Sequence, residues 1–437
     1  MPKSNISKKD REAKTGVEPR EAKSSFLPKL NAILVIAIVI ALVFFAYINI
    51  DFSPDEHPPK VITGLKVQSI IPSREAGIIN GHEHIQDLGQ GPKWNAAMDR
   101  VGISTTVMLG SPDATFILHP EGLFTGYKEN NEELFKLVDK YPDRYIAFPT
   151  IYTYDDDKLN LLDSYLKRGA VGLKLFTGHF AVFYEELGPL NIKTMYPIYE
   201  YCERNKVPII WHVHLGKEDL RQQFEEVMED FPDLICNIPH FMLSSIDLWQ
   251  TEGEGRVRYY LETYDNLYTD ISFGYWAKDG LWRISNHTEV FREFLTEFQD
   301  RFTFGTDMVC TKHPRKDVEW IANLTQGYRD ILEKKYFNLT VKFDIEGDFN
   351  GDNPGTHNGL NLTQDVLDKI YYDNMVKFLN CRKYNVNLSD VLKDSKLKYE
   401  SNTTRSTEDD GLETSTNGLL PDYSSLVAVD ERYVQYN

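Results

Sequence analysis

Cysteine is scarce in this chain of 437 residues, which holds only Cys202, Cys236, Cys310 and Cys381. So few thiols in so long a chain exclude the disulfide framework that holds small secreted domains together. Three of the four fall in or beside segments that we expect in the core. We therefore predict buried free thiols.

Excess positive charge is also missing. Lys and Arg number 48 against 66 Asp and Glu, and the formal net charge is −18 at pH 7. Binding to nucleic acid requires a basic face that neutralises phosphates. No such face is visible in this sequence, so we expect no nucleic-acid partner.

Two common catalytic motifs are absent. No Gly-x-Ser-x-Gly elbow occurs, which disfavours a hydrolase with a serine nucleophile. Residues 80–84, at the first predicted turn from strand to helix, read Asn-Gly-His-Glu-His and lack a Gly-rich phosphate loop. This argues against an open, doubly wound dinucleotide fold.

One long apolar run is present near the N-terminus. Residues 32–48 are all apolar or aromatic, and residues 30–49 reach the roughly 20 residues that a helix needs to cross a bilayer. A cleaved signal peptide has a shorter basic head, a shorter apolar core and a small-x-small cleavage site. We therefore predict an uncleaved transmembrane signal-anchor.

Charge on either side of this run sets its predicted orientation. Residues 1–29 carry eight Lys and Arg, whereas Asp51, Asp55 and Glu56 follow the run. Positive charge is retained on the cytoplasmic side, so we predict a single-pass protein of the cell membrane with a cytoplasmic N-terminus and an extracytoplasmic catalytic domain. The predicted organisation is a basic tail (1–29), a transmembrane helix (30–49), a linker (50–70), a barrel (71–388) and a mostly disordered polar tail (389–437).

The central region alternates between strand-like and helix-like segments. Eight strand-like runs lie near Ile78, Thr105, Tyr145, Val171, Ile209, Leu234, Leu267 and Phe302. Helical periodicity appears between them, at residues 130–141, 157–168, 195–205 and 220–230. This alternation predicts an α/β fold with a parallel sheet, and eight such units close most simply as a (β/α)8 TIM-like barrel. In that fold the functional side chains sit at the C-terminal ends of the strands.

Metal-competent side chains follow several of these runs. His82 and His84 end the first run, and residues i and i+2 of a strand project to the same face, so the two imidazoles can share one divalent cation. His212 and His214 end the fifth run, His240 follows the sixth and Asp307 follows the eighth. Chance does not readily explain so many coincidences at strand ends.

With Lys174 on the fourth strand, these residues resemble the amidohydrolase superfamily. The closest pattern is its amidohydrolase-related (amidohydrolase 2) branch of metal-dependent hydrolases and decarboxylases. Segments 172–176, 231–234, 304–307 and 370–374 also look like that branch. The resemblance spans roughly residues 71–380 and rests on the order of the motifs. It implies a distorted barrel with a catalytic divalent metal, most often zinc.

The donor types agree with this implication. Neutral imidazoles and a carboxylate suit zinc, and an open coordination position would lower the pKa of a bound water to about 7. We expect His82, His84, His212 and Asp307 as metal ligands. His212 and His214 compete for one role, and the spacing from Pro208 favours His212. Asp307 is either a ligand or the base that receives the water proton, with a helix cap as the alternative.

His240 has three possible roles, as a second-metal ligand, as the group that polarises the substrate carbonyl, or as a structural histidine. His214, His179 and Asp270 are candidates for substrate binding, and we count His240, Lys174 and Asp307 as catalytic candidates.

Lys174 interrupts an apolar strand. If the Lys174 side chain faced the helical layer, its ammonium group would be buried without a partner. We therefore expect this side chain to point into the barrel. In binuclear members of the superfamily a carbamylated lysine on this strand bridges two metals, so the resemblance implies one ion, or two if Lys174 is carbamylated. Otherwise Lys174 holds substrate or pairs with Asp270 or Asp307.

Three functions compete. The first is a membrane-anchored metal-dependent hydrolase that cleaves a C–N or C–O bond in a small molecule with metal-activated water. The second is a metal-dependent non-oxidative decarboxylase that uses the same site. The third is a non-catalytic barrel that acts as a binding module. The long irregular stretch at residues 336–360 is expected to be a lid or the contact of a homo-oligomer.

Overall fold

The computed structural model describes residues 77–117, 123–179, 183–242, 253–272, 277–339 and 355–379. The predicted membrane span, the linker and the polar tail after residue 388 lie outside these ranges. Across the ranges, none of the helices combines the length and apolar character that crossing a bilayer requires.

Eight parallel strands form the centre of the fold. Hydrogen-bonded neighbours run in the order β1-β2-β3 and β4-β5-β6-β7-β8, and every pair is parallel. The strands are β1 (Ile78–Glu83), β2 (Ile103–Leu109), β3 (Tyr145–Phe148), β4 (Leu173–Leu175), β5 (Ile209–Trp211), β6 (Cys236–Ile238), β7 (Leu267–Asp270) and β8 (Phe302–Thr303).

Two further contacts join these sheets into a ring. A parallel bridge pairs Thr150, after β3, with Lys174 in β4. At the other junction, the Gly81 amide donates to the Phe304 carbonyl at 2.7 Å and a bridge pairs Ile85 with Cys310. Every strand therefore has two neighbours, and the predicted (β/α)8 barrel is confirmed.

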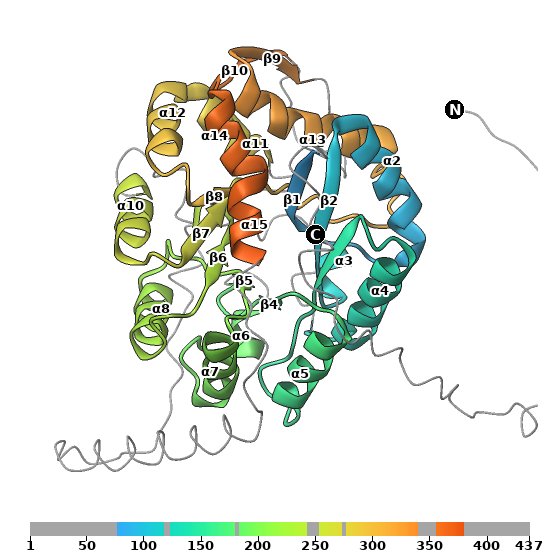
Figure 1. Cartoon of the computed structure of the whole chain (residues 1–437), viewed down its shortest axis with the longest axis vertical. Coiled ribbons are helices and arrows are strands. Elements are labelled where there is room, and N and C mark those ends of the chain that lie inside the picture. Colours follow the sequence, from blue (N-terminus) through green and yellow to red (C-terminus); the bar gives the residue numbers. More distant parts are fainter. Residues whose placement is uncertain are drawn as a thin grey trace, which may run out of the picture. The chain divides into compact units, whose positions relative to one another are not determined.

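Helices follow the strands and lie around them (Figure 1). The connection from β1 to β2 holds η3 (Leu88–Gln90) and α2 (Gly91–Val101), and later connections hold α3 (Ala114–Ile117), α4 (Tyr127–Lys140), α5 (Lys158–Arg168), α6 (Tyr184–Leu187), η4 (Lys193–Met195), α7 (Tyr196–Asn205), α8 (Glu218–Asp230), α9 (Pro239–Met242), α10 (Glu254–Thr263), α11 (Ala277–Asn286) and α12 (Thr288–Glu297). After β8 come α13 (Val318–Glu333), the antiparallel pair β9 (Tyr336–Leu339) and β10 (Gly355–Asn358), α14 (Gln364–Asp368), η8 (Lys369–Asp373) and α15 (Asn374–Leu379).

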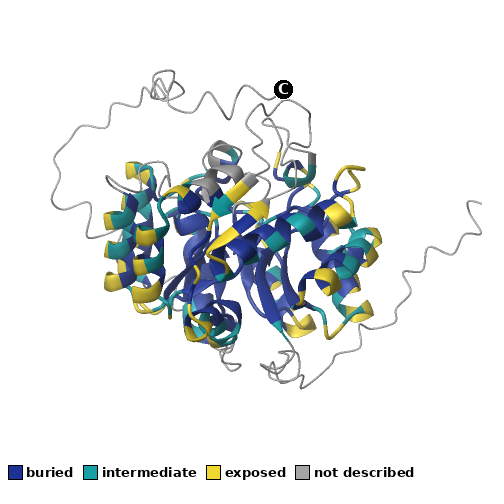
Figure 2. Cartoon of the chain, turned by 90° about the horizontal axis from the view of Figure 1, so that it is seen from above, coloured by how far each residue is buried: buried dark blue, intermediate teal, exposed yellow. Residues whose placement is uncertain are grey.

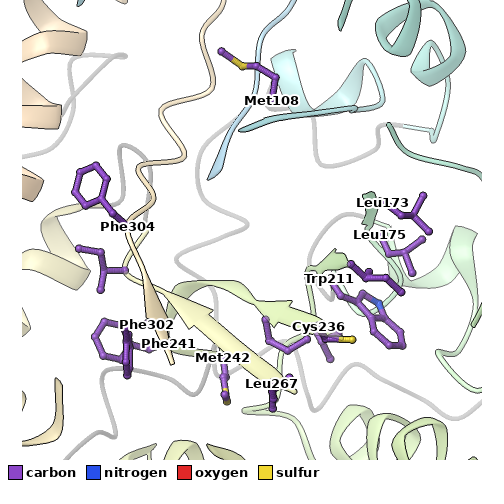
Figure 3. Close-up of a cluster of buried hydrophobic side chains, with 14 of the residues drawn as sticks. Met108, Leu173, Leu175, Trp211, Cys236, Phe241, Met242, Leu267, Phe302 and Phe304 are labelled. Carbon is purple, nitrogen blue, oxygen red and sulfur yellow. The ribbon is translucent and has the colours of Figure 1, made fainter. Parts of the chain in front are cut away.

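Side chains alternate between the inside and the outside of the barrel, as the two-residue period of a strand requires. Leu173, Leu175 and Trp211 face the helices and belong to the large core between the two layers (Figure 3). Ile146, Phe148 and Ile210 belong to a second cluster, which contains residues of β2 and β3 together with α15. The strands are buried, while the exposed residues gather on the helices (Figure 2).

Helix α15 closes part of the barrel interior. The Phe378 ring stacks on Phe148 of β3, with ring centroids 6.3 Å apart, and its centroid lies 5.5 Å from that of Tyr268 in β7. Met375 and Leu379 are buried in the same cluster. Apolar contacts with α15 therefore fill part of the barrel interior.

Cys202, Cys236 and Cys310 are buried free thiols, as predicted, and Cys381 lies outside the described residues. The stretch predicted to be one irregular lid or oligomer contact is partly regular, because β9 and β10 pair within it. Residues 340–354 of this stretch are not described.

Candidate metal centre

The C-terminal ends of β1 and β8 bring three of the predicted ligands together. His82 lies in β1 and His84 directly after it. The Asp307 carboxylate, beyond β8, places Oδ1 3.8 Å from His82 Nε2 and 3.4 Å from His84 Nε2. One ligand atom of each residue lies within 4.8 Å of the others. Zinc bonds to nitrogen and oxygen are about 2.0–2.2 Å long, so a small contraction would let all three share one ion.

His240 borders the same point from the sixth strand end. Its Nε2 lies 3.8 Å from Asp307 Oδ2, and its ring centroid lies 5.1 Å from that of His82. Residues 240–242 all have positive φ, and His240 itself has φ 59° and ψ 48°. Non-glycine residues adopt this region rarely and at a cost, and such strain gathers at functional sites. The bend turns the His240 imidazole back toward Asp307.

Hydrogen bonds at Nδ1 fix which nitrogen of each ring carries the proton. His82 Nδ1 donates to Asp270 Oδ2 at 3.0 Å, because a carboxylate oxygen only accepts. The Ser111 hydroxyl donates to the Leu109 carbonyl at 3.1 Å and accepts from His84 Nδ1 at 2.6 Å. His240 Nδ1 donates to the Ser272 carbonyl. In all three rings, then, Nε2 carries the lone pair and faces Asp307, the arrangement found around ligating histidines.

Asp270 links these rings. Its Oδ1 accepts from the backbone amides of His240 and Ser272, each at 3.0 Å, and its Oδ2 accepts from His82. The candidate for substrate binding thus supports two histidines instead. Its own oxygens are already used by protein donors, which disfavours direct contact with substrate.

Two buried atoms at the centre lack hydrogen-bond partners in the described part of the chain. They are His82 Nε2 and Asp307 Oδ1. Buried polar atoms are nearly always paired, so two orphans that face each other call for a missing group. The donors, three imidazole nitrogens and a carboxylate, are those that zinc and similar first-row ions accept. The residues therefore fit a divalent cation.

Burial keeps the imidazoles neutral. Desolvation, followed by the nearby charge of Lys174, lowers the pKa of both His82 and His84 well below the usual value. Desolvation also lowers the pKa of His240 to about 3. The Asp307 pKa is raised well above its usual value by burial and by Glu83. A ligand set of neutral imidazoles is already prepared at neutral pH.

Sequence reasoning missed Glu83, which lies between the two histidines. Its fully buried carboxylate accepts hydrogen bonds from the amides of His84, Met308 and Val309, at 2.9, 3.0 and 2.7 Å. Burial raises its pKa to about 7. A glutamate inside an apolar run signals a buried acid that needs donors, and this signal was available in the sequence.

His212 is not part of the group formed by His82, His84 and Asp307. It gathers with His179 and His214, and one ligand atom of each of these three lies within 4.8 Å of the others. The His212 ring centroid lies 5.2 Å from that of His240, so His212 stands between the two groups. Its role as a ligand of the first ion stays a prediction.

Lys174 points into the barrel, as expected. It is fully buried, and its Nζ makes no hydrogen bond within the described ranges, nor a salt bridge there to Asp270 or Asp307. Nζ lies 4.9 Å from the centroid of the Phe176 ring. Desolvation lowers its pKa to about 8, against the opposing effect of the Asp307 and Asp270 charges. Pairing with either aspartate is therefore not observed.

This chain was compared with known proteins. Solved structures similar to this chain include an uncharacterised TIM-barrel protein from Bordetella bronchiseptica, 16% identical, which covers 70% of this chain and 98% of its own at a TM-score of 0.45. A probable 2-pyrone-4,6-dicarboxylic acid hydrolase from Acinetobacter baumannii is 14% identical, with coverages of 69% and 99% and a TM-score of 0.45. A 2,6-dihydroxybenzoate decarboxylase from Rhizobium is also 14% identical, with coverages of 69% and 98% and a TM-score of 0.42.

A search of curated proteins finds no match. The amidohydrolase family model matches residues 80–380, which contain all of the barrel except the first two residues of β1, and every residue of the site. This family is metal-dependent and includes hydrolases and decarboxylases. The chain therefore belongs to the amidohydrolase family and is an enzyme of the amidohydrolase type.

Proposed function

We propose that this protein is a metal-dependent hydrolase that cleaves a C–N or C–O bond of a small molecule. The observation that carries the proposal is the convergence of three Nε2 lone pairs on the Asp307 carboxylate, each ring being fixed by a hydrogen bond at Nδ1. His82, His84, His240 and Asp307 would hold the ion, and we favour zinc because three of the four donors are nitrogens. When bound, a divalent cation supplies Lewis-acid chemistry that acidifies water and polarises a carbonyl.

The residues around this point have separate tasks. Asp307 would accept the proton of the attacking water and return it to the leaving nitrogen or oxygen as the bond to carbon breaks. His240 would act as a ligand, because its Nδ1 proton is committed to the Ser272 carbonyl and its Nε2 has no proton to give a carbonyl. Asp270 would orient His82 and His240 without contacting substrate.

An aromatic wall borders the site and supports a substrate with an apolar or ring-containing part. The Phe176 centroid lies 6.2 Å from that of His84, and Phe124, Phe176 and Phe183 pack on one another at centroid distances of 5.4 to 5.7 Å. Flat apolar side chains beside a polar centre are typical of small-molecule sites.

Hydrolysis is tested on the purified full-length chain loaded with zinc. A panel of amides, esters, lactones and aromatic carboxylates is incubated in water enriched in 18O. We expect one 18O atom in the carboxylate product and none in the amine or alcohol that leaves, no release of carbon dioxide, and at least a hundredfold lower rate in Asp307→Asn. His313→Gln, which changes an exposed histidine in the loop between β8 and α13, is the matched control.

A decarboxylase is the second candidate. In this reaction the ion would hold a carboxylate or hydroxyl of the substrate, and Asp307 would carry the proton to the carbon from which carbon dioxide departs. Carbon dioxide release with no 18O in the product would select this reaction. Metal binding without any turnover would instead favour a binding module.

We also propose that residues 30–49 anchor the chain in the cell membrane, with the barrel outside the cytoplasm. Support comes from the unbroken apolar run and the basic residues that precede it. Protease added to intact cells should digest the barrel and leave a short N-terminal fragment in the membrane. A barrel that resists protease until the cells are lysed would refute the predicted orientation.

A further inference from the structure

Lys174 and Thr150 are paired across two neighbouring strands at the barrel mouth. A parallel bridge joins the two residues, and the Lys174 amide donates to the Pro149 carbonyl at 2.9 Å. Thr150 lies two residues beyond the end of β3, so the bridge places Lys174 at the level of the strand ends. Residues that are paired on adjacent strands project to the same side of the sheet. Both side chains therefore enter the barrel next to each other.

Each of these side chains ends in a buried polar atom that lacks a partner. Lys174 and Thr150 are fully buried, and neither Lys174 Nζ nor Thr150 Oγ1 makes a hydrogen bond within the part of the chain that the structure describes. The backbone of Thr150 is fixed, because its amide donates to Asn131 Oδ1 at 3.0 Å and its carbonyl accepts from Asn131 Nδ2 at 2.8 Å. A hydroxyl held beside an unpaired ammonium indicates a missing group that accepts hydrogen bonds.

The charge of Lys174 reaches the candidate metal centre. Burial, and after it the Lys174 charge, lowers the pKa of both His82 and His84. A divalent cation held by these rings and Asp307 would add positive charge to the same interior. An unpaired buried charge is costly, and a bound anion would offset this cost.

Lys174 and Asp307 approach the barrel mouth from opposite sides, since β4 lies across the closed ring from β8. The Asp307 side chain is 21% exposed, so solvent reaches the mouth on that side. Phe176 borders both positions, because its ring centroid lies 4.9 Å from Lys174 Nζ and 6.2 Å from the centroid of His84. A small molecule that spans the mouth could contact Lys174 with one end and the candidate metal centre with the other.

We propose that Lys174 and Thr150 bind a carboxylate group of the substrate, which is therefore a small acid whose cleaved bond is separate from this carboxylate. The inference rests on the proposed function, because it places the cleaved bond at the centre formed by His82, His84 and Asp307. A carboxylate has two acceptor oxygens, one for the ammonium and one for the hydroxyl. Phosphate and sulfate have more oxygens, which these two donors would leave unpaired.

Carboxylate binding to the full-length chain tests the proposal without turnover. Zinc is first removed with chelator, because zinc itself can bind a carboxylate. Acetate, benzoate and isophthalate are then titrated by calorimetry, each beside its uncharged amide. We expect at least one carboxylate to bind ten times more tightly than its amide. Lys174→Met should weaken binding of that carboxylate by about 10- to 100-fold and leave amide binding unchanged.

Thr150→Val keeps the shape of the side chain but removes its hydroxyl. It should weaken carboxylate binding by about 3- to 10-fold, as expected for the loss of one hydrogen bond. Lys167→Met is the matched control and should bind like the wild type, because this lysine of α5 is exposed and paired with Asp163.

The melting temperature of the ligand-free protein is a second readout. Lys174→Met removes a buried ammonium without a partner, so this variant should melt at or above the wild-type temperature. A lower melting temperature would mean that Lys174 stabilises the empty barrel, and would count against a role in binding.

Equal carboxylate affinity in the wild type and Lys174→Met, or no preference over the amides in the wild type, would overturn the proposal. A carbamate signal in 13C NMR after incubation with 13C-bicarbonate, absent from Lys174→Met, would also overturn it, because a carbamylated lysine has no ammonium. Hydrolysis of neutral substrates without any preference for carboxylates would refute this inference alone. Selective carboxylate binding through Lys174 without hydrolysis would support it and refute the hydrolase function instead.

Discussion

Glu83 and Lys316 stabilise the same turn, Glu83 through backbone amides and Lys316 through backbone carbonyls. Glu83 accepts hydrogen bonds from the amides of Met308 and Val309, while Lys316 Nζ donates to the carbonyls of the same two residues, each at 2.8 Å. Both side chains are buried. The turn carries Asp307 at φ 54° and Val309 at φ 53°, a conformation that non-glycine residues do not adopt without support.

Loss of the Glu83 carboxylate should loosen this turn. Glu83→Ala leaves several buried donors unpaired, at about 1–3 kcal/mol for each one that finds no water. We expect a loss of about 3 kcal/mol in the free energy of unfolding and zinc affinity lower by about 10- to 100-fold. Denaturant titration and competition with a chromogenic chelator measure the two effects.

Glu83→Gln retains one acceptor oxygen, so its free energy of unfolding and its zinc affinity should fall less than those of Glu83→Ala. Lys316→Met keeps the length of the side chain but removes its donors, so it should also weaken zinc binding. If Glu83→Ala matched the wild type in both its free energy of unfolding and its zinc affinity, the turn would not depend on the Glu83 carboxylate.

The hydrogen bonds at Nδ1 should determine metal affinity. Ser111→Ala removes the acceptor that fixes the His84 ring, and Asp270→Asn removes the carboxylate that fixes His82. Changes to such supporting residues typically cost 10- to 100-fold in metal affinity. Ser164→Ala is the matched control, since this exposed hydroxyl in α5 donates to the Leu161 carbonyl of its own helix. Equal zinc affinity in Ser111→Ala and Ser164→Ala would show that the His84 ring is oriented by other contacts.

Removing the ion should destabilise the barrel, because the ligands come from β1 and from the loop after β8. A ligand at a hundredfold excess over its dissociation constant stabilises the folded state by about 2.7 kcal/mol. Chelator should therefore lower the melting temperature of the wild type. In His82→Ala, chelator should leave the melting temperature unchanged if the ion at this site accounts for the stabilisation. If chelator also leaves the melting temperature of the wild type unchanged, this counts against an ion that stabilises the barrel.

Two glycines beside the site should respond differently to alanine. A Cβ at Gly305 would lie 2.9 Å from His82 Cβ and 3.4 Å from Asp270 Cγ, close to the rigid base of both side chains. A Cβ at Gly81 would lie closest to Met375 Cε, at 2.1 Å, the end of a flexible side chain that can move away. Overpacking of a rigid site costs about 1–3 kcal/mol.

We therefore expect Gly305→Ala to weaken zinc binding more than Gly81→Ala, while Gly81→Ala acts mainly on stability. Calorimetric zinc titration and thermal melting of both variants separate the two effects. The reverse order of zinc affinities would mean that the His82 ring tolerates displacement.

The barrel could be predicted from the sequence because its strands are short apolar runs with polar residues directly after them. Six of the eight predicted positions lie within the observed strands, while β4 and β6 each begin two residues later than predicted, at Leu173 and Cys236. The candidate ligands His82, His84 and Asp307 were visible for the same reason, since each ends such a run.

The partition of the histidines was not predictable. Whether His212 joins His82 or His179 depends on the loop after β4, where Gly178 lets two backbones approach. The position of His240 depends on three successive residues with positive φ, which no propensity indicates. The role of Glu83 depends on a turn more than two hundred residues away in the chain. Long-range contacts of this kind determine the geometry of the site, and local sequence patterns do not indicate them.

The junction where β8 meets β1 has a consequence for biosynthesis. The Asp307 amide donates to the His82 carbonyl at 2.9 Å, so one of the bonds that seal the ring joins two candidate ligand residues directly. A nascent chain that has emerged only as far as β7 has His82, His84 and His240 but neither this bond nor the carboxylate. The candidate ligand set is complete only when the last strand arrives, so ribosome-bound chains that end before residue 300 should retain less zinc after gel filtration than chains that extend past Asp307.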